Sequence, residues 1–224
     1  MISVKRMFGE TTLRVFAWAS VISEILIVVT GGGVRLTASG LGCPTWPLCT
    51  EDSLVNVPEM GIHGIIEFGN RVLTFALLLI AVIFFFAALL SRSSRKVLST
   101  AILLIVGIFL QAIVGGISVL TNLNPWIVGL HFVISAGMIA ISSIQLWRVY
   151  SPAVSQSTST ERLLSNTFIV FATAALLVGI VVTGSGPHAG DAEAPRNDLN
   201  SELWQHSFLP CIFGLGARIG SNIH

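Results

Sequence analysis

Three side chains able to bind a ligand or move a proton follow one another at helical spacing near the start of an apolar segment. His63, Glu67 and Arg71 are separated by intervals of four residues, which places them on one face of a helix. Asn70 lies seven residues after His63 and therefore near the same face. A buried glutamate and arginine could form a purely structural ion pair. That interpretation leaves the added histidine unexplained.

A second histidine, His131, stands in another apolar segment shortly after Pro125. Proline suits the first turn of a helix, so His131 should lie one to two turns inside that helix. A single histidine within a membrane helix is usually a hydrogen-bonded packing residue. Two histidines at similar depth in one bundle, such as His63 and His131, are also typical of axial haem ligands. The residues alone leave both interpretations open.

The elements that must position these side chains are membrane-spanning helices. The chain has 224 residues, of which 53% are hydrophobic and only 10% charged, whereas soluble domains carry roughly 25% charged residues. Apolar stretches of about 20 residues predict spanning helices, and five occur, with a weaker sixth: residues 13–31, 64–90, 98–120, 127–147, 164–183 and 203–217. The formal net charge of +1 indicates no nucleic-acid partner. The remaining partner that composition implies is membrane lipid.

The basic residues predict the orientation of these spans, because lysine and arginine gather in cytoplasmic loops. Bases occur before the first span, between the second and third, and between the fourth and fifth: Lys5, Arg6, Arg14, Arg92, Arg95, Lys96, Arg148 and Arg162. The intervening loops hold mainly acids. We therefore expect a multi-pass protein of the cell membrane with its N-terminus in the cytoplasm and the loop 32–62 outside.

Cys43 and Cys49 lie in that outer loop, on the oxidising side of the membrane. The turn between them, Pro-Thr-Trp-Pro, favours a disulfide over the alternative of two free, small side chains. Cys211 has no evident partner and is expected to be structural. Gln111, which precedes Gly115 and Gly116 in the third span, is expected to form hydrogen bonds between helices.

A short repeat indicates how the chain is organised. Val-Val-Thr-Gly ends the first span at residues 28–31 and the fifth span at residues 181–184. This repeat predicts an all-α protein with a four-helix bundle in residues 1–150 and the start of a second, incomplete bundle in residues 161–224. His206 would then occupy the region that matches His63, while His188 is expected to be exposed.

Four stretches of the sequence resemble the haem A synthase family, in its actinobacterial branch, over residues 15–200. Residues 30–49, Thr-Gly-Gly-Gly-Val-Arg-Leu-Thr-Ala-Ser-Gly-Leu-Gly-Cys-Pro-Thr-Trp-Pro-Leu-Cys, resemble the first outer loop of that family. Residues 66–71, Ile-Glu-Phe-Gly-Asn-Arg, are similar to its second-helix motif. Residues 123–126 with His131 are similar to its fourth-helix motif. Residues 183–191 resemble the matching loop of its second half.

The resemblance implies an enzyme with eight helices in two bundles that oxidises the C8 methyl of haem O to the formyl of haem A for cytochrome oxidase assembly. It implies haem O as substrate and haem b as a second haem, with haem O synthase and an electron donor as partners. Glu67 corresponds to the catalytic glutamate. Cys43 and Cys49 correspond to the paired cysteines. We predict a haem site of His63, Asn70, Arg71 and His131, with both histidines as iron ligands and His206 as a further candidate.

Two departures from the family pattern qualify these expectations. Many members carry histidine where this chain has Asn70, and an amide is a poor haem ligand, so His63 is the expected substitute. After about residue 202 the resemblance ends, and the last two helices are expected to be missing. The chain could be completed by a partner or a homo-oligomer. The alternatives to an active enzyme are a membrane haem-binding assembly factor and an inactive, shortened remnant.

Overall fold

A computed structural model of the chain describes residues 2–150, 158–185 and 190. The described residues form five long helices and one short 3-10 helix, in the order α1 (Ile2–Leu36), η1 (Pro58–Met60), α2 (Gly61–Leu90), α3 (Arg95–Leu120), α4 (Pro125–Tyr150) and α5 (Ser159–Ser185). All five long helices are long and apolar enough to cross a membrane. The predicted all-α membrane architecture is therefore confirmed. The segment 203–217, His188, His206 and Cys211 lie outside the described residues.

The helices extend beyond the apolar stretches of the sequence because polar residues cap and prolong their ends. The Ser94 side chain accepts a hydrogen bond from the backbone of Val97 at the start of α3. Thr158 and Glu161 form a reciprocal capping box before α5, in which the Thr158 N–H donates to Glu161 Oε2 at 2.8 Å and the Glu161 N–H donates to Thr158 Oγ1 at 3.3 Å. Hydropathy alone locates the apolar interior of each helix but not these polar ends.

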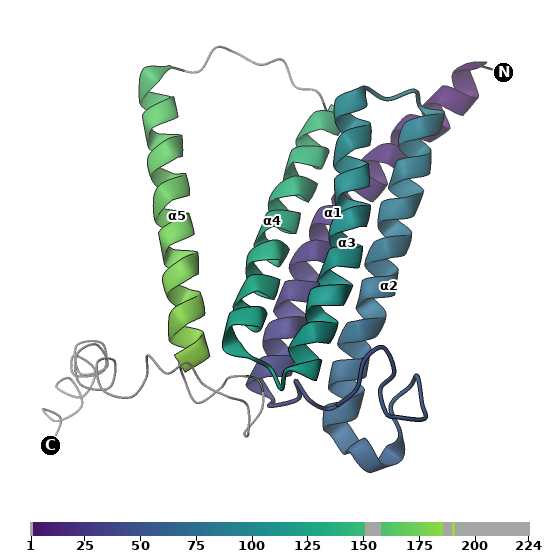
Figure 1. Ribbon diagram of the computed structural model, residues 1–224. Coiled ribbons are helices and arrows are strands. Elements are labelled where there is room, and N and C mark those ends of the chain that lie inside the picture. Colours follow the sequence, from purple (N-terminus) through teal and green to yellow (C-terminus); the bar gives the residue numbers. More distant parts are fainter. Residues whose placement is uncertain (1, 151–157, 186–189, 191–224) are drawn as a thin grey trace, which may run out of the picture.

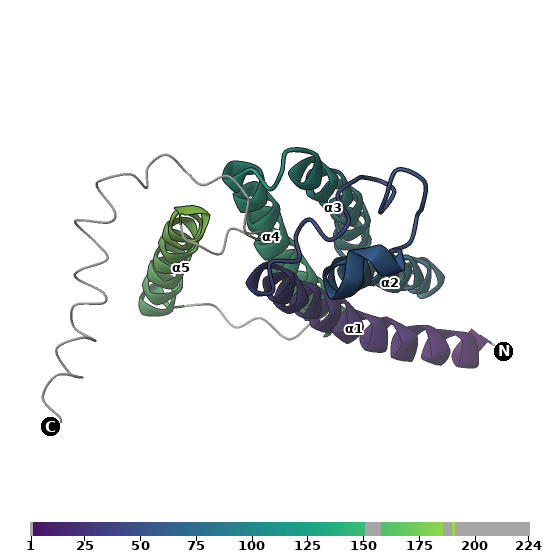
Figure 2. The ribbon, with the colours of Figure 1, turned by 90° about the horizontal axis from the view of Figure 1, so that it is seen from below.

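Helices α1 to α4 form a closed ring in which each helix contacts two neighbours (Figures 1 and 2). The neighbouring pairs are α1 with α2, α2 with α3, α3 with α4, and α4 with α1. Over the described residues, the diagonal pairs α1 with α3 and α2 with α4 make no comparable contact. Side chains from α2 and α4 can therefore meet across the middle of the bundle, where bundles commonly place ligands.

Two apolar clusters hold this bundle together. One lies toward the end of the bundle where α2 joins α3, and the other lies near its middle. Small residues alternate with large ones, so the helices approach closely and interdigitate. The first cluster comprises Leu13, Ala17, Phe84, Ala87, Ala88, Val97 and Ala101, and the second Leu77, Ala81, Leu104, Ile108 and Met138. Large exposed apolar residues such as Phe75 and Phe109 cover the outside of the helices, as expected for a surface in contact with lipid.

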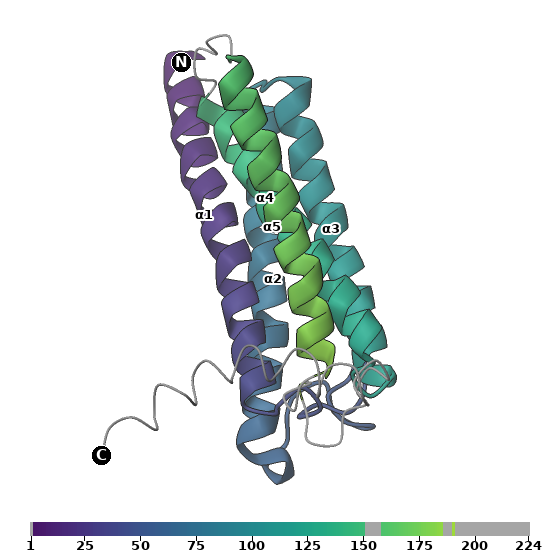
Figure 3. The same ribbon diagram turned by 90° about the vertical axis from the view of Figure 1, so that its left-hand side faces the viewer.

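The fifth long helix, α5, contacts α4 and stands beside the ring (Figures 1 and 2), so that it lies in front of α4 in Figure 3. Its contact with α4 includes the close approach of Ile180 to Gly129. At the same end of the bundle, the Gly40 N–H donates to the Gly190 carbonyl at 2.9 Å. We call this end of the bundle, which residues 37–57 cover, the loop end. We call the other end, formed by residues 91–94, the opposite end.

The division of the chain into two bundles, at residues 1–150 and 161–224, stays a prediction.

The contact between Gly107 and Met138 provides a test of packing between α3 and α4. A side chain at Gly107 would collide with the Met138 side chain, which is only 3% exposed. We expect Gly107→Val to lower the free energy of unfolding by about 1–3 kcal/mol because the core must shift to admit the added carbons. Unfolding of the purified protein in detergent, followed by tryptophan fluorescence, measures this change. Gly137→Val is the matched control, since no atom lies within 4 Å of a side chain added there; an equal loss in that variant would contradict the proposed contact.

Candidate functional site

Glu67 and Arg71 form an ion pair one helical turn apart, near the loop end of α2. Arg71 Nη2 lies 2.5 Å from Glu67 Oε1, and Arg71 Nε donates to the same oxygen at 3.1 Å. The Glu67 residue is 6% exposed. Burial of a carboxylate is costly unless it is paired and hydrogen-bonded, and both conditions are met here. The sequence spacing of four residues correctly placed these two side chains on one face.

The remaining Arg71 donors hold the polypeptide of the loop between α1 and α2. Arg71 Nη1 donates to the carbonyls of Thr45 and Leu48 at 3.0 and 3.1 Å, and Nη2 donates to the carbonyl of Cys43 at 2.8 Å. Together with the two bonds to Glu67, these contacts use all five N–H groups of a guanidinium. Arg71 therefore fastens the loop onto α2, a role that the sequence spacing did not reveal.

The fastened loop contains the disulfide. Cys43 and Cys49 are joined by a disulfide and are both fully buried, which confirms the predicted pairing. The Cys43 N–H donates to Glu67 Oε2 at 2.6 Å, so both oxygens of Glu67 accept hydrogen bonds. Glycine is required at position 42, because a side chain there would collide with the His63 carbonyl of α2. The disulfide loop and the start of α2 thus form one compact unit.

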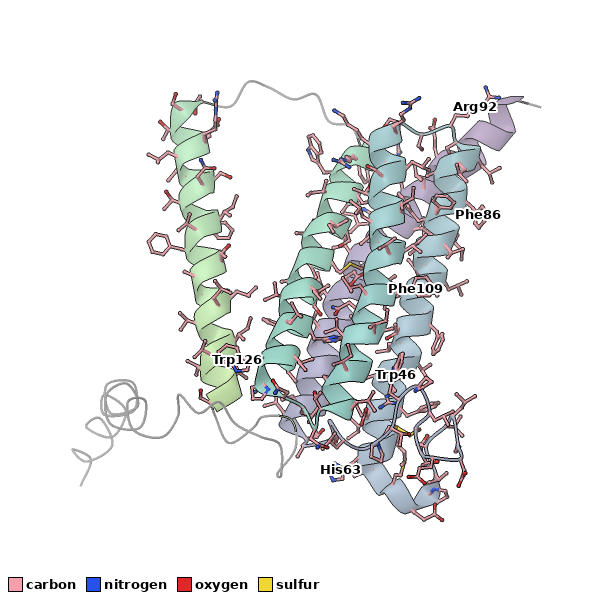
Figure 4. All side chains as sticks on the ribbon, viewed as in Figure 1. Trp46, His63, Phe86, Arg92, Phe109 and Trp126 are labelled. Carbon is pink, nitrogen blue, oxygen red and sulfur yellow. A yellow bond between two sulfur atoms is a disulfide. The ribbon has the colours of Figure 1, made fainter. Side chains whose placement is uncertain are left out.

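This loop also reaches the third helix. The ring of Trp46 lies against Gly116 of α3, where a side chain on the glycine would collide with it. Figure 4 shows Trp46 between the loop and the helices, with His63 at the tip of the loop end. The loop therefore covers the loop-end faces of both α2 and α3.

The two candidate iron ligands lie in different surroundings. His63 is exposed, and its Nδ1 lies 2.9 Å from Ser39 Oγ in the loop. His131 lies inside the bundle, with its ring beside Gly115 of α3. Among the described residues, its Nδ1 is buried and has no hydrogen-bond partner. The structure thus separates an interior histidine with an unpaired nitrogen from a surface histidine that is already engaged.

Two amide side chains near these histidines link helices. Asn70 Oδ1 accepts a hydrogen bond from Thr30 Oγ1 of α1 at 2.7 Å, which directs Asn70 toward α1. Gln111 Nε2 donates to the His131 carbonyl at 3.2 Å and to Ser135 Oγ at 2.5 Å. The predicted interhelical role of Gln111 is confirmed.

Sequence reasoning missed a further polar layer deeper in the bundle. Glu24 of α1 is 5% exposed, and Gln145 of α4 is fully buried. Gln145 Nε2 donates to Ser20 Oγ at 3.3 Å, one turn from Glu24. The signal was present, because an ionisable residue within a predicted span is a functional candidate by default.

Two buried polar groups of the bundle could take part in ligand binding or proton transfer. They are the Nδ1 atom of His131, which has no hydrogen-bond partner among the described residues, and the Glu67 carboxylate, on the helix diagonal to α4. A single imidazole nitrogen is the kind of ligand that a haem iron accepts from a protein. No group of three or more histidine, cysteine, aspartate or glutamate side chains able to hold a metal occurs among the described residues.

Comparison with known proteins identifies relatives of the chain. The chain is similar to proteins named Heme A synthase. The one from Listeria welshimeri is 31% identical over 136 residues, which cover 60% of this chain and 44% of that protein. The one from Bacillus pumilus is 31% identical, over 60% of this chain and 43% of that protein. The one from Geobacillus thermodenitrificans is 30% identical, over 55% of this chain and 40% of that protein. This chain thus spans less than half the length of these relatives. No solved structure gives a significant match.

A family model described as cytochrome oxidase assembly protein matches residues 14–63 and 55–199. These two segments include the disulfide loop, the Glu67–Arg71 pair and His131. Because the matches cover most of the sequence, the chain belongs to the cytochrome oxidase assembly protein family.

Proposed function

We propose that this chain is a haem A synthase, which oxidises the C8 methyl of haem O to the formyl of haem A. The observation that carries the proposal is the buried Glu67 carboxylate, which is held under the disulfide loop in the same bundle as the unpaired imidazole nitrogen of His131. The names of the similar proteins support the same activity. Because the chain matches less than half the length of those proteins, activity of this chain by itself is part of the proposal.

His131 is the residue that best fits the iron of the substrate haem. Its Nδ1 is buried without a partner in the part of the chain that the structure describes, which is costly unless a ligand or a proton donor satisfies it. Binding of a haem would relieve that cost. His63 fits less well as an iron ligand because it is exposed and hydrogen-bonded to Ser39. We therefore assign His131 as the principal ligand and place His63 at the entrance of the site.

Glu67 would handle protons during the oxidation. Conversion of a methyl to a formyl adds an oxygen atom and removes hydrogen, so protons must leave the reacting carbon. Glu67 accepts three hydrogen bonds, from Arg71 and the Cys43 backbone, and a carboxylate has about four acceptor positions. One position is thus left for a proton or for a positive charge developing on the carbon. Arg71 keeps the carboxylate in place and also holds the loop that excludes water.

Haem b, an electron donor and haem O synthase complete the proposal. Haem b would supply electron transfer when bound. His206, the candidate ligand for the iron of haem b, lies outside the described residues. The oxidation needs an oxidant that also supplies the oxygen atom; with molecular oxygen in that role, the electron donor supplies the electrons that reduce the second oxygen atom to water. Haem O synthase supplies the haem O.

Asn70 is assigned to the wall of the substrate site rather than to the iron, because its side chain is hydrogen-bonded to Thr30.

The proposal includes an orientation in the cell membrane. The opposite end of the bundle gathers the basic side chains, whereas the loop end carries acids and the disulfide. The basic residues there are Arg14, Arg92, Arg95, Lys96 and Arg148, and the acids at the loop end are Glu51, Asp52 and Glu59. Positive charge on the cytoplasmic side and a disulfide on the oxidising side favour a cytoplasmic opposite end.

Haem extraction tests the activity directly. We would express the complete 224-residue chain in a host that makes haem O but no haem A, and separate the extracted haems by chromatography. Appearance of haem A is the expected result. If only haem B or haem O co-purifies, the chain binds haem without oxidising it, as an assembly factor would. If no haem co-purifies, the haem site itself is wrong.

Histidine variants test the assignment of the iron ligand. We expect His131→Ala to reduce the haem content of the purified protein at least tenfold, because loss of a ligand leaves the iron without its protein bond. His63→Ala should retain its haem. The ratio of Soret to protein absorbance measures both variants. A normal haem content in His131→Ala would contradict the role of His131 as the principal ligand. A loss of haem confined to His63→Ala would assign that role to His63.

Glu67→Gln separates catalysis from binding. Glutamine preserves the size of the side chain but neither accepts a proton nor carries a negative charge. We expect haem A formation to fall about 100-fold, as is typical when a general acid–base group is removed, while haem content stays near that of the unmodified protein. Glu59→Gln, at an exposed carboxylate of the same end, is the control. Free-thiol labelling should show an intact disulfide in both variants; haem A formation at the normal level in Glu67→Gln would refute the role.

A further inference from the structure

A polar cleft at the opposite end of the bundle is separate from the proposed haem site. It has a volume of about 290 Å³ and is lined by α1, the connection between α2 and α3, the start of α3, and the end of α4. We call it the serine–arginine cleft. Its lining residues are Glu10, Leu13, Arg14, Ser91, Ser93, Ser94, Val97, Arg148 and Val149. Three helices and a loop therefore contribute to one concave polar surface.

The side chains of the cleft carry a net positive charge. Two guanidinium groups, of Arg14 and Arg148, face one carboxylate, that of Glu10, which has further interactions of its own. Arg148 Nη1 donates to the Lys96 carbonyl at 2.7 Å, which holds Arg148 against the first turn of α3. The Arg14 guanidinium lies 5.5 Å from the centre of the Tyr150 ring, which holds it beside α4. Both positive groups are thus fixed in place at the cleft.

Hydrogen-bond donors complement this charge. The cleft includes Ser94, the N-cap of α3, where the first backbone N–H groups of the helix and the positive end of its dipole favour an anion. Ser91 contributes a second, independent feature. Its hydroxyl is buried and has no hydrogen-bond partner among the described residues. A buried hydroxyl without a partner is costly, and an anion in the cleft would supply the missing acceptor.

We propose that the serine–arginine cleft binds a phosphate group. Guanidinium groups, serine hydroxyls and a helix N-terminus are the donors that recognise phosphate oxygens. The position of the cleft favours a lipid headgroup as the source, because basic pockets between transmembrane helices bind anionic headgroups. Trp18 Nε1 donates to the Tyr150 hydroxyl at 3.1 Å beside the cleft, and such aromatic residues mark the membrane–water interface. Free phosphate shares this chemistry and is the alternative source.

Lipid binding to the purified, complete chain in a non-ionic detergent tests the proposal. Native mass spectrometry would measure retention of phosphatidylglycerol, with diacylglycerol of the same acyl chains as the probe that lacks phosphate. Thermal unfolding would be followed with each lipid, and with inorganic phosphate against sodium chloride at equal ionic strength. We expect retention of phosphatidylglycerol, a raised unfolding temperature, and no effect of diacylglycerol. Stabilisation by inorganic phosphate alone would assign the site to free phosphate and still support the chemistry.

Three variants make the test specific to the cleft. Arg14→Gln should weaken phosphatidylglycerol binding about tenfold, the effect of losing one charge-assisted hydrogen bond. Ser91→Ala, which removes one hydroxyl, should also weaken phosphatidylglycerol binding, but by less than Arg14→Gln. Arg92→Gln is the matched control, since Arg92 is exposed at the same end but does not line the cleft (Figure 4). Equal binding of the two lipids, normal binding by both cleft variants, or an equal loss in Arg92→Gln would overturn the proposal.

Discussion

The guanidinium of Arg71 is the group on which the candidate site depends. The charge of a partly buried arginine is costly unless its donors are satisfied, and here two donors bond to Glu67 and three bond to carbonyls of the disulfide loop. The same contacts neutralise Glu67, bring the loop onto α2, and give Trp46 its position over α3. Loss of any partner would leave a charged group unpaired near the membrane interior. The loop, the carboxylate and the helix end are therefore coupled rather than independent.

The sequence was sufficient for the helices because a lipid interior imposes one requirement, an apolar stretch long enough to span it. It was also sufficient for the Glu67–Arg71 pair, since both residues belong to one helix and their spacing determines their shared face. It was insufficient for His63, because α2 begins only two residues earlier and leaves this side chain exposed beside Ser39. The contacts of Arg71 with the loop could not be predicted either, because they join a side chain of α2 to the backbone of an irregular loop 23 to 28 residues earlier in the chain.

The polar groups deeper in the bundle show why depth matters as much as residue type. A hydrogen bond between Gln145 and Ser20 joins α4 to α1, and Glu24 is buried one turn from Ser20. Hydrogen bonds between membrane helices contribute roughly 0.6–2 kcal/mol each, so one Gln145–Ser20 bond does not by itself compensate a buried carboxyl. Burial of a carboxyl group is costly unless it is paired and hydrogen-bonded. Glu67 meets both conditions through Arg71 and the Cys43 backbone, so the surroundings of the two glutamates differ.

The repeated Val-Val-Thr-Gly motif makes different contacts in its two positions. Thr30 uses its hydroxyl to bind Asn70 within the ring of α1 to α4. Thr183 instead offers its carbonyl to the Arg35 side chain, and this contact, with the Gly40–Gly190 hydrogen bond, attaches α5 to the loop end. The attachment joins Thr183 and Gly190 to residues 35–40 but adds no described side chain to the Glu67–Arg71–loop unit. The chemistry proposed for this chain therefore rests on contacts within α1 to α4, while α5 bears on the neighbouring surface of α4.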